Sequence, residues 1–161
     1  MIWLIATLSL LIYAPIAEYA IHRWVMHSPH LGRGTWWTEH AVEHHGRRRN
    51  DINIDIDALS VLFAASPLLL FAGVLGWPWV VAVLLACIAY AALWSSLHAA
   101  HHGIRGSWTT RLGIHPIWLH HHQLHHQNPR TNFGTVFIFT DVVFRTQCPP
   151  AQCEGNTESA A

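Results

Sequence analysis

Three long apolar stretches limit what this chain can fold into. The first runs from Ile2 to Ala17 and can continue as a helix to about Met26, the second covers Ala58 to Leu75, and the third covers Pro78 to Leu97. Each is close to the roughly 20 residues that a helix needs to cross a hydrocarbon core of about 30 Å. The sequence therefore predicts an all-α integral membrane bundle with about three to four membrane helices and a histidine-rich cap on the cytoplasmic side.

The second and third stretches form a predicted transmembrane hairpin, because the tight turn Gly76–Trp79 joins them and its tryptophans favour the membrane interface. The first stretch is interpreted as a membrane anchor, since it lacks the basic start and clean cleavage site of a signal peptide. A composition of 52% hydrophobic and 11% charged residues is too apolar for an ordinary soluble domain.

The arginines predict the orientation. All of them lie outside the N-terminus and the hairpin turn, and the chain has no lysine. The positive-inside rule then makes the arginine-bearing side cytoplasmic, in the inner membrane if the source is bacterial. The formal net charge is zero, which argues against a nucleic-acid partner.

Fifteen histidines occur in the chain, and most fall into four spaced groups. Neutral imidazole is the commonest side-chain metal ligand and suits iron, zinc, copper and nickel. The spacing gives ten candidate metal ligands: His22, His27, His40, His44, His45, His98, His102, His122, His125 and His126. Ten imidazoles are too many for one metal ion and fit two.

Helical neighbours three or four residues apart share a face. This rule pairs His40 with His44 and His98 with His102, and it groups His122 with His125 and His126. His22 and His27 are five apart, so they converge only if the helix ends or unwinds near Trp24 to Met26.

The remaining chain is expected to be short helices and connections. A helix over Trp36–His45, a surface connection over Arg47–Asp57, a loop over Gly103–Gly113 and a helix from Pro116 to Gln127 are predicted. The segment Thr135–Thr140 has strand propensity, but a short amphipathic helix ending near Phe144 is an equal alternative. Residues 1–146 are expected to be one domain, and 147–161 a disordered tail.

The ordered boxes around one hairpin resemble the fatty acid hydroxylase/sterol desaturase superfamily. His22-Arg-Trp-Val-Met-His27 is similar to its first box, and His122-Gln-Leu-His125-His126, with Asn132-Phe-Gly134 and Asp141-x2-Phe144-x-Thr146, to its ending. The second box has three intervening residues where two are common. The third, His98-Ala-Ala-His101-His102, leaves either His101 or His102 as its second ligand, and the spacing favours His102.

The resemblance implies a membrane enzyme with a histidine-bound di-iron centre that uses dioxygen to hydroxylate, or desaturate, an unactivated C–H bond of a lipid. Its electrons would come from a separate electron-transfer protein, and zinc could replace the two iron ions in a preparation. Bacterial carotenoid hydroxylases are the second candidate in the superfamily. A histidine-rich membrane metal-binding or transport protein is the candidate outside it.

Several other polar residues are expected to surround the metals rather than bind them. Glu18, four residues before His22, could orient that imidazole, or it could be a carboxylate at a helix end. The expected supporting residues are Glu18, His101, His121, Asn132 and Asp141; His30, His115 and His120 are expected to be surface or supporting groups.

Overall fold

The computed structural model describes residues 2–30, 35–46, 54–104 and 106–149. All regular secondary structure in these ranges is helical, and no strand occurs in them. The all-α prediction is thus confirmed for the described part of the chain. The strand alternative for Thr135–Thr140 is wrong, because these residues form an irregular segment that leads into the short helix α7 (Phe139–Val143).

The N-terminal apolar stretch forms one helical rod, Ile2–Met26, as predicted. It comprises α1 (Ile2–Leu8) and α2 (Ala14–Ala20), each followed by a wider π-helical segment, Ser9–Tyr13 and Ile21–Met26. Pro15, at the start of α2, has no N–H to donate to the preceding turn, which accounts for an irregular helix there.

The predicted hairpin is present as α4 (Ile54–Leu75) and α5 (Trp77–His101). Gly76 joins them with φ +106°, a backbone conformation that glycine adopts without a steric penalty. Two helices, Ile2–Met26 and Trp77–His101, are long and apolar enough to cross a membrane, and the described side chains of α4 add a shorter apolar helix, Phe63–Leu75. The described chain therefore has two long apolar helices and one shorter one, where three to four membrane helices were predicted.

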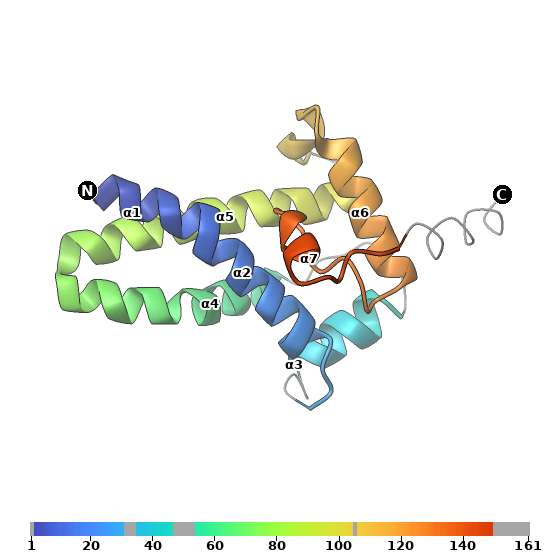
Figure 1. Ribbon diagram of the computed structural model, residues 1–161, viewed down its shortest axis with the longest axis horizontal. Helices are drawn as coiled ribbons and strands as arrows, with labels where there is room; N and C mark the ends of the chain where they lie inside the picture. Colours follow the sequence, from blue (N-terminus) through green and yellow to red (C-terminus); the bar gives the residue numbers. More distant parts are fainter. Residues whose placement is uncertain (1, 31–34, 47–53, 105, 150–161) are drawn as a thin grey trace.

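The rod crosses over the α4–α5 hairpin, and its N-terminus lies at the same end of the molecule as the hairpin turn (Figure 1). Small side chains permit this crossing, since Ala6 packs against Ala82 and Ala86. The opposite end carries α3 (Thr35–Trp37), which continues as the π-helical segment Thr38–His44, and α6 (His115–Gln127). The histidine-bearing elements therefore gather at one end of the bundle.

The other connections differ only slightly from those predicted from the sequence. A 3-10 turn, Trp108–Arg111, lies inside the predicted loop, and α6 begins one residue before Pro116. Of the predicted connection Arg47–Asp57, residues 54–57 belong to α4 and 47–53 lie outside the described residues. Most of the predicted tail, residues 150–161, also lies outside them.

The segment after α6 folds back onto the bundle. Val136 is almost fully buried and packs in one apolar cluster with Tyr90 and Leu97 of α5. α7 lies against α2 (Figure 1). This return brings the residues between α6 and α7 next to the histidines at the end of the rod.

Candidate metal centre

Five imidazoles form the first histidine cluster. Their ligand nitrogens all lie within 4.8 Å of one another, although they come from three separate parts of the chain. The members are His22, His27, His40, His45 and His125. We call this set cluster one.

π-Helical turns explain how residues five apart converge in cluster one. The His27 N–H donates to the His22 carbonyl, and the His45 N–H donates to the His40 carbonyl, each at 3.1 Å. An i to i+5 hydrogen bond places such residues one turn apart on the same side of the helix. The helix therefore widens near Trp24 to bring His22 and His27 together, and the same device brings His40 and His45 together.

Four further imidazoles form the second cluster, again with their ligand nitrogens within 4.8 Å of one another. The members are His44, His102, His122 and His126, which we call cluster two. His98 borders it, because its Nε2 atom lies 3.2 Å from Nε2 of His44. The structure thus brings nine of the ten predicted ligands into two clusters and places the tenth beside one of them.

The grouping within the histidine boxes differs from the α-helical expectation. His40 and His44 belong to different clusters, because the segment that carries them is π-helical. His125 joins cluster one, whereas His122 and His126 join cluster two, so this box serves both. Pairing His40 with His44, and grouping His125 with His122 and His126, is therefore wrong at the level of the single cluster.

The two clusters are neighbours. The rings of His45 and His126 stack with their centroids 4.3 Å apart, and those of His40 and His44 lie 5.2 Å apart. Two ions held by these clusters would lie close together, as a two-metal centre requires.

Backbone carbonyl groups fix the orientation of two imidazoles. Nδ1 of His22 lies 2.5 Å from the Phe133 carbonyl oxygen, and Nδ1 of His125 lies 2.7 Å from that of Thr131. A carbonyl oxygen only accepts, so each Nδ1 carries the hydrogen and each Nε2 presents its lone pair. Both Nε2 atoms then face cluster one ready to bind a cation.

Hydrogen bonding cannot satisfy the nitrogens of cluster one. Nε2 of His40 lies 2.9 Å from Nε2 of His22, and 3.1 and 3.2 Å from Nε2 of His27 and His45. One ring nitrogen either donates or accepts a single in-plane hydrogen bond, so at most one of these three contacts is a hydrogen bond.

A metal ion resolves this crowding. Metal–imidazole bonds of about 2.0–2.1 Å at right angles separate neighbouring nitrogens by about 3 Å. The spacings around His40 match that value, as do the 3.0 and 3.1 Å from Nε2 of His122 to Nε2 of His102 and His126 in cluster two. The donor set therefore fits metal ions at both clusters.

The imidazoles are held in the form that binds metal. Burial lowers the pKa of these rings, and for all but His102 the neighbouring imidazoles lower it further. The residues concerned outside the apolar helices are His27, His40, His45, His102, His122 and His125. Neutral imidazole is the metal-binding form, so no proton has to be removed at neutral pH.

Asp141 organises the segment that orients His22. Its fully buried carboxylate accepts the backbone N–H groups of Phe133 and Gly134 and the Thr146 hydroxyl, and it lies 3.0 Å from Nε2 of His121. Because the Phe133 carbonyl holds His22, Asp141 supports that ligand through one residue of backbone. This agrees with the supporting role expected of Asp141 and His121.

Asn132 fastens the same segment to α6. Its side-chain amide donates to the His121 carbonyl and accepts the Cys148 N–H, at 3.1 and 2.7 Å, and its φ of +56° reverses the chain. Asparagine tolerates this left-handed conformation better than most residues. A structural role for Asn132 therefore agrees with the expectation.

Glu18 does not orient His22, so that expectation is wrong. Nδ1 of His22 donates to the Phe133 carbonyl oxygen. The Glu18 carboxylate instead accepts the backbone N–H groups of Thr135 and Val136 and the Tyr90 hydroxyl. Glu18 therefore connects α2 to the returning segment and to α5.

The remaining histidines lie outside both clusters. His101 is buried, and neither of its ring nitrogens has a hydrogen-bond partner within the part of the chain that the structure describes. The geometry thus favours His102, not His101, as the candidate ligand of the third box. His30 and His120 are exposed, and the ring of His115 lies 5.7 Å from that of His101.

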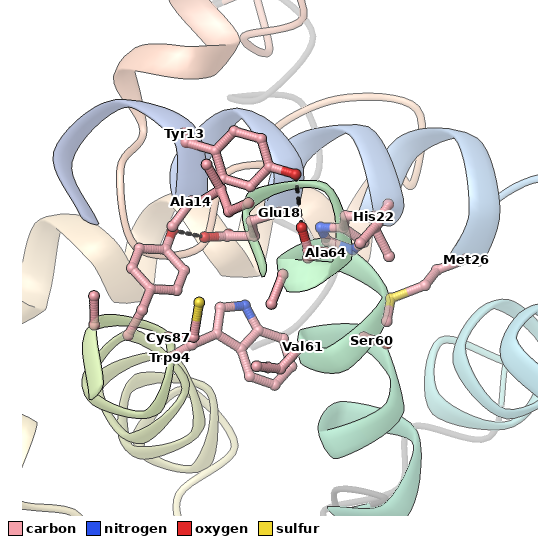
Figure 2. A pocket seen from close by; sticks show the side chains of 15 residues that line it. Tyr13, Ala14, Glu18, His22, Met26, Ser60, Val61, Ala64, Cys87 and Trp94 are labelled. Atoms are coloured by element: carbon pink, nitrogen blue, oxygen red, sulfur yellow. Dashed lines mark hydrogen bonds between the residues drawn. The ribbon is translucent and has the colours of Figure 1, made fainter. Parts of the chain in front are cut away.

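An apolar cavity reaches cluster one. It lies between α2, α4 and α5 and is lined by small or apolar side chains such as Ala14, Ala64 and Trp94, with His22 and Met26 at one end (Figure 2). The space, its open side included, is about 720 Å³. Sequence reasoning missed this cavity, because small residues scattered over three helices show no local pattern.

Two tyrosine hydroxyl groups join the helices around the cavity. Tyr13 donates to the Ala64 carbonyl at 2.7 Å and links α4 to the rod, while Tyr90 donates to Glu18 and links α5 to α2 (Figure 2). An apolar space that ends at an imidazole of a metal cluster is suited to a hydrocarbon substrate.

Comparison with known proteins decides the family. The model of the family described as "Fatty acid hydroxylase" matches residues 7–146, which is most of the chain. The chain belongs to the fatty acid hydroxylase family. Membership in this family implies an oxidoreductase, and the matched region contains every histidine of both clusters. No curated protein and no solved structure gave a significant match.

Proposed function

We propose that this fatty acid hydroxylase family member is a membrane-bound di-iron enzyme that hydroxylates an unactivated C–H bond of a lipid with dioxygen. The observation that supports this most is the pair of adjacent histidine clusters, one of which borders an apolar cavity. Ligands at helix ends argue against a metal transporter, whose binding sites are expected near the bilayer midplane.

The proposed cofactor is one iron ion at each cluster, with cluster one and cluster two as the ligand sets. Bound iron would supply the oxidising power for C–H hydroxylation from dioxygen and external electrons. Zinc binds the same imidazoles, so a zinc-containing preparation would not identify the working metal.

The chain's own residues would hold the metal ions, orient the ligands and shield the site from water. Phe133 and Thr131 keep the Nε2 lone pairs of His22 and His125 directed into cluster one. The cavity walls would exclude water and place a hydrocarbon segment beside His22, which is the only cluster residue that lines the cavity. No side-chain acid, base or nucleophile is needed for this role.

The proposed substrate is a membrane lipid or another hydrophobic molecule that enters from the bilayer. The cavity lies between α4 and the two helices that are long and apolar enough to cross a membrane, so a hydrocarbon chain would reach it without passing through water. The arginines favour a cytoplasmic location for both clusters, where a separate electron-transfer protein would dock.

Lipid profiling of cells with and without the chain tests the proposal. Expression of the wild type should produce a hydroxylated lipid that is absent when His125 is replaced by Ala. His120→Ala, which changes an exposed histidine outside both clusters, is the matched control and should retain the product. An unchanged product in the His125→Ala variant would refute the di-iron enzyme. A product that carries a new double bond and no added oxygen would show that the reaction is desaturation and not hydroxylation.

A further inference from the structure

The segment between α6 and the end of α7 lies deep against the apolar helices. Glu18 accepts the N–H groups of Thr135 and Val136, and the ring of Phe144 stacks on Tyr19 with the centroids 4.5 Å apart. We propose that residues 133–144 form a re-entrant segment whose outer face contacts the hydrocarbon chains of the bilayer. This inference rests on the membrane placement in the proposed function.

The depth of the segment follows from helix geometry. Glu18 precedes Met26 by eight residues, which is about 12 Å along the axis at about 1.5 Å per residue. The whole rod, Ile2–Met26, is about 37 Å long by the same rise and exceeds a hydrocarbon core of about 30 Å by less than 8 Å. Even with all of this excess at the Met26 end, Glu18 and the groups bonded to it lie inside the core.

The second apolar helix places the segment below its end as well. Val136 packs in one cluster with Tyr90 and Leu97. Leu97 and Tyr90 precede His101, the last residue of α5, by four and eleven residues, or about 6 and 16 Å. The returning segment therefore packs below the ends of both long helices, with α7 beside α2 (Figure 1).

Two buried carboxylates make an irregular backbone tolerable at this depth. Asp141 accepts the N–H groups of Phe133 and Gly134, and Glu18 accepts those of Thr135 and Val136. Four consecutive donors are thus satisfied without a regular helix or sheet. Non-helical backbone is expected at membrane depth only where such internal partners exist.

The outer face of the segment is apolar throughout. Phe139, Val142, Val143 and Phe144 are 43, 59, 65 and 38% exposed. Asp141 is the only charged residue in 133–144, and it is fully buried. α7 packs on α2, and the neighbouring side chains Ile12 and Ile16 of the rod are also exposed and apolar, so both surfaces suit the same lipid environment.

A positive charge marks the point where the segment leaves the membrane. Arg145 is exposed and directly follows Phe144, and Arg23 donates to the Tyr19 hydroxyl at 2.7 Å. Long arginine side chains reach from apolar surroundings to the headgroups. The distribution of apolar and charged groups thus matches a segment that enters and leaves through one leaflet, not a docking surface for a water-soluble protein.

Site-directed spin labelling in lipid nanodiscs tests this placement. A label is attached at Val143→Cys, at Leu70→Cys on the exposed face of α4, and at Gln127→Cys at the exposed end of α6, with the native cysteines replaced. Collisions with oxygen and with a water-soluble nickel chelate are measured. The Val143 label should match Leu70, with several-fold less contact with the chelate than the Gln127 label.

The outcomes separate this inference from the proposed function. If the Leu70 label reports lipid but the Val143 label reports water, or is shielded from both reagents, the re-entrant segment is wrong and the membrane bundle stands. If the Leu70 label also reports water, the membrane placement fails and this inference fails with it.

A second measurement does not depend on cysteine replacement. Val143→Asp in the otherwise wild-type chain should lower the thermal midpoint in nanodiscs by several degrees, because it places a carboxylate in hydrocarbon. Gln127→Asp is the matched control and should leave the midpoint unchanged. Equal midpoints for the two variants would overturn the inference.

Discussion

The His27 backbone N–H donates to the carbonyl of His22, five residues earlier, at a distance of 3.1 Å. This single π-helical bond places both imidazoles in cluster one, where an α-helical turn would direct them apart. The same relationship recurs between His40 and His45. The geometry of the proposed metal centre therefore depends on two local departures from the α-helix.

Lengthening the first π-helical segment should remove one metal ion. One alanine inserted after Trp24, which is about half exposed, turns the five-residue spacing of His22 and His27 into six, which neither a π-helical nor an α-helical turn places on one face. Metal analysis should find one ion per chain in place of two. Trp24→Ala changes the side chain at the same place but keeps the spacing, and it should retain both ions; two ions in the insertion variant would show that the five-residue spacing is dispensable.

Substitutions in the third box should show that His102, and not His101, is the metal ligand. His102→Leu removes a member of cluster two, so the variant should contain less metal and yield less hydroxylated product. His101→Leu should keep both ions, because neither nitrogen of His101 faces a cluster partner in the described residues. It should also maintain or raise Tm, since two buried unpartnered polar atoms are removed, each costing about 1–3 kcal/mol. Metal loss in His101→Leu alone would reverse the assignment.

Asp141→Asn should destabilise the segment that supports His22. The new amide would direct N–H groups at the donors of Phe133 or Gly134, and the buried hydrogen bonds lost would cost about 3 kcal/mol. Thermal unfolding in detergent should show Tm lowered by several degrees. Thr146→Val, which removes one donor to Asp141 and keeps the carboxylate, should have a smaller effect; equal effects would contradict the role given to the charge.

Gly134→Ala should be destabilising for a steric reason. A Cβ atom there would lie 2.6 Å from Thr140 Oγ1 and 2.8 Å from the Phe137 carbonyl oxygen. Relieving this overlap should cost about 1–3 kcal/mol. Gly73→Ala in α4 is the control, because nothing lies within 4 Å of its Cβ position and alanine favours a helix by up to about 1 kcal/mol. Chemical denaturation should therefore rank the wild type between the two variants.

Filling the cavity should reduce turnover without removing metal. Ala64→Leu adds a bulky side chain to the cavity wall, so a hydrocarbon substrate should reach His22 less easily. Product yield should fall while the metal content stays at the wild-type value. Leu70→Ala, on the exposed side of the same helix, should leave the yield unchanged. If both variants had the wild-type yield, the cavity would not be the substrate site.

The sequence predicted those features of the fold that depend on the composition of single segments. Uncharged stretches of sufficient length predicted the rod and the hairpin, and Gly76 indicated the turn between α4 and α5. For α4, the described side chains cover only part of the predicted stretch Ala58–Leu75, and over Phe63–Leu75 they form an apolar helix as predicted.

The partition of the histidines could not be predicted by the α-helical rule. The two spacings of five, in His22–His27 and His40–His45, were a usable indication of π-helical turns, since both pairs converge. The contacts that orient the ligands could not be predicted from the sequence for another reason. The Phe133 carbonyl meets His22 across more than a hundred residues of sequence, and a backbone group has no sequence pattern.

Isotopic labelling tests the central claim most directly. Cells that express the chain are grown under labelled dioxygen, and the oxygen isotope in the new hydroxyl group of the lipid product is measured by mass spectrometry. The account predicts that the label comes from dioxygen in the wild type and that no product forms in the His125→Ala variant. A hydroxyl oxygen derived from water, or a labelled product from the variant, would contradict it.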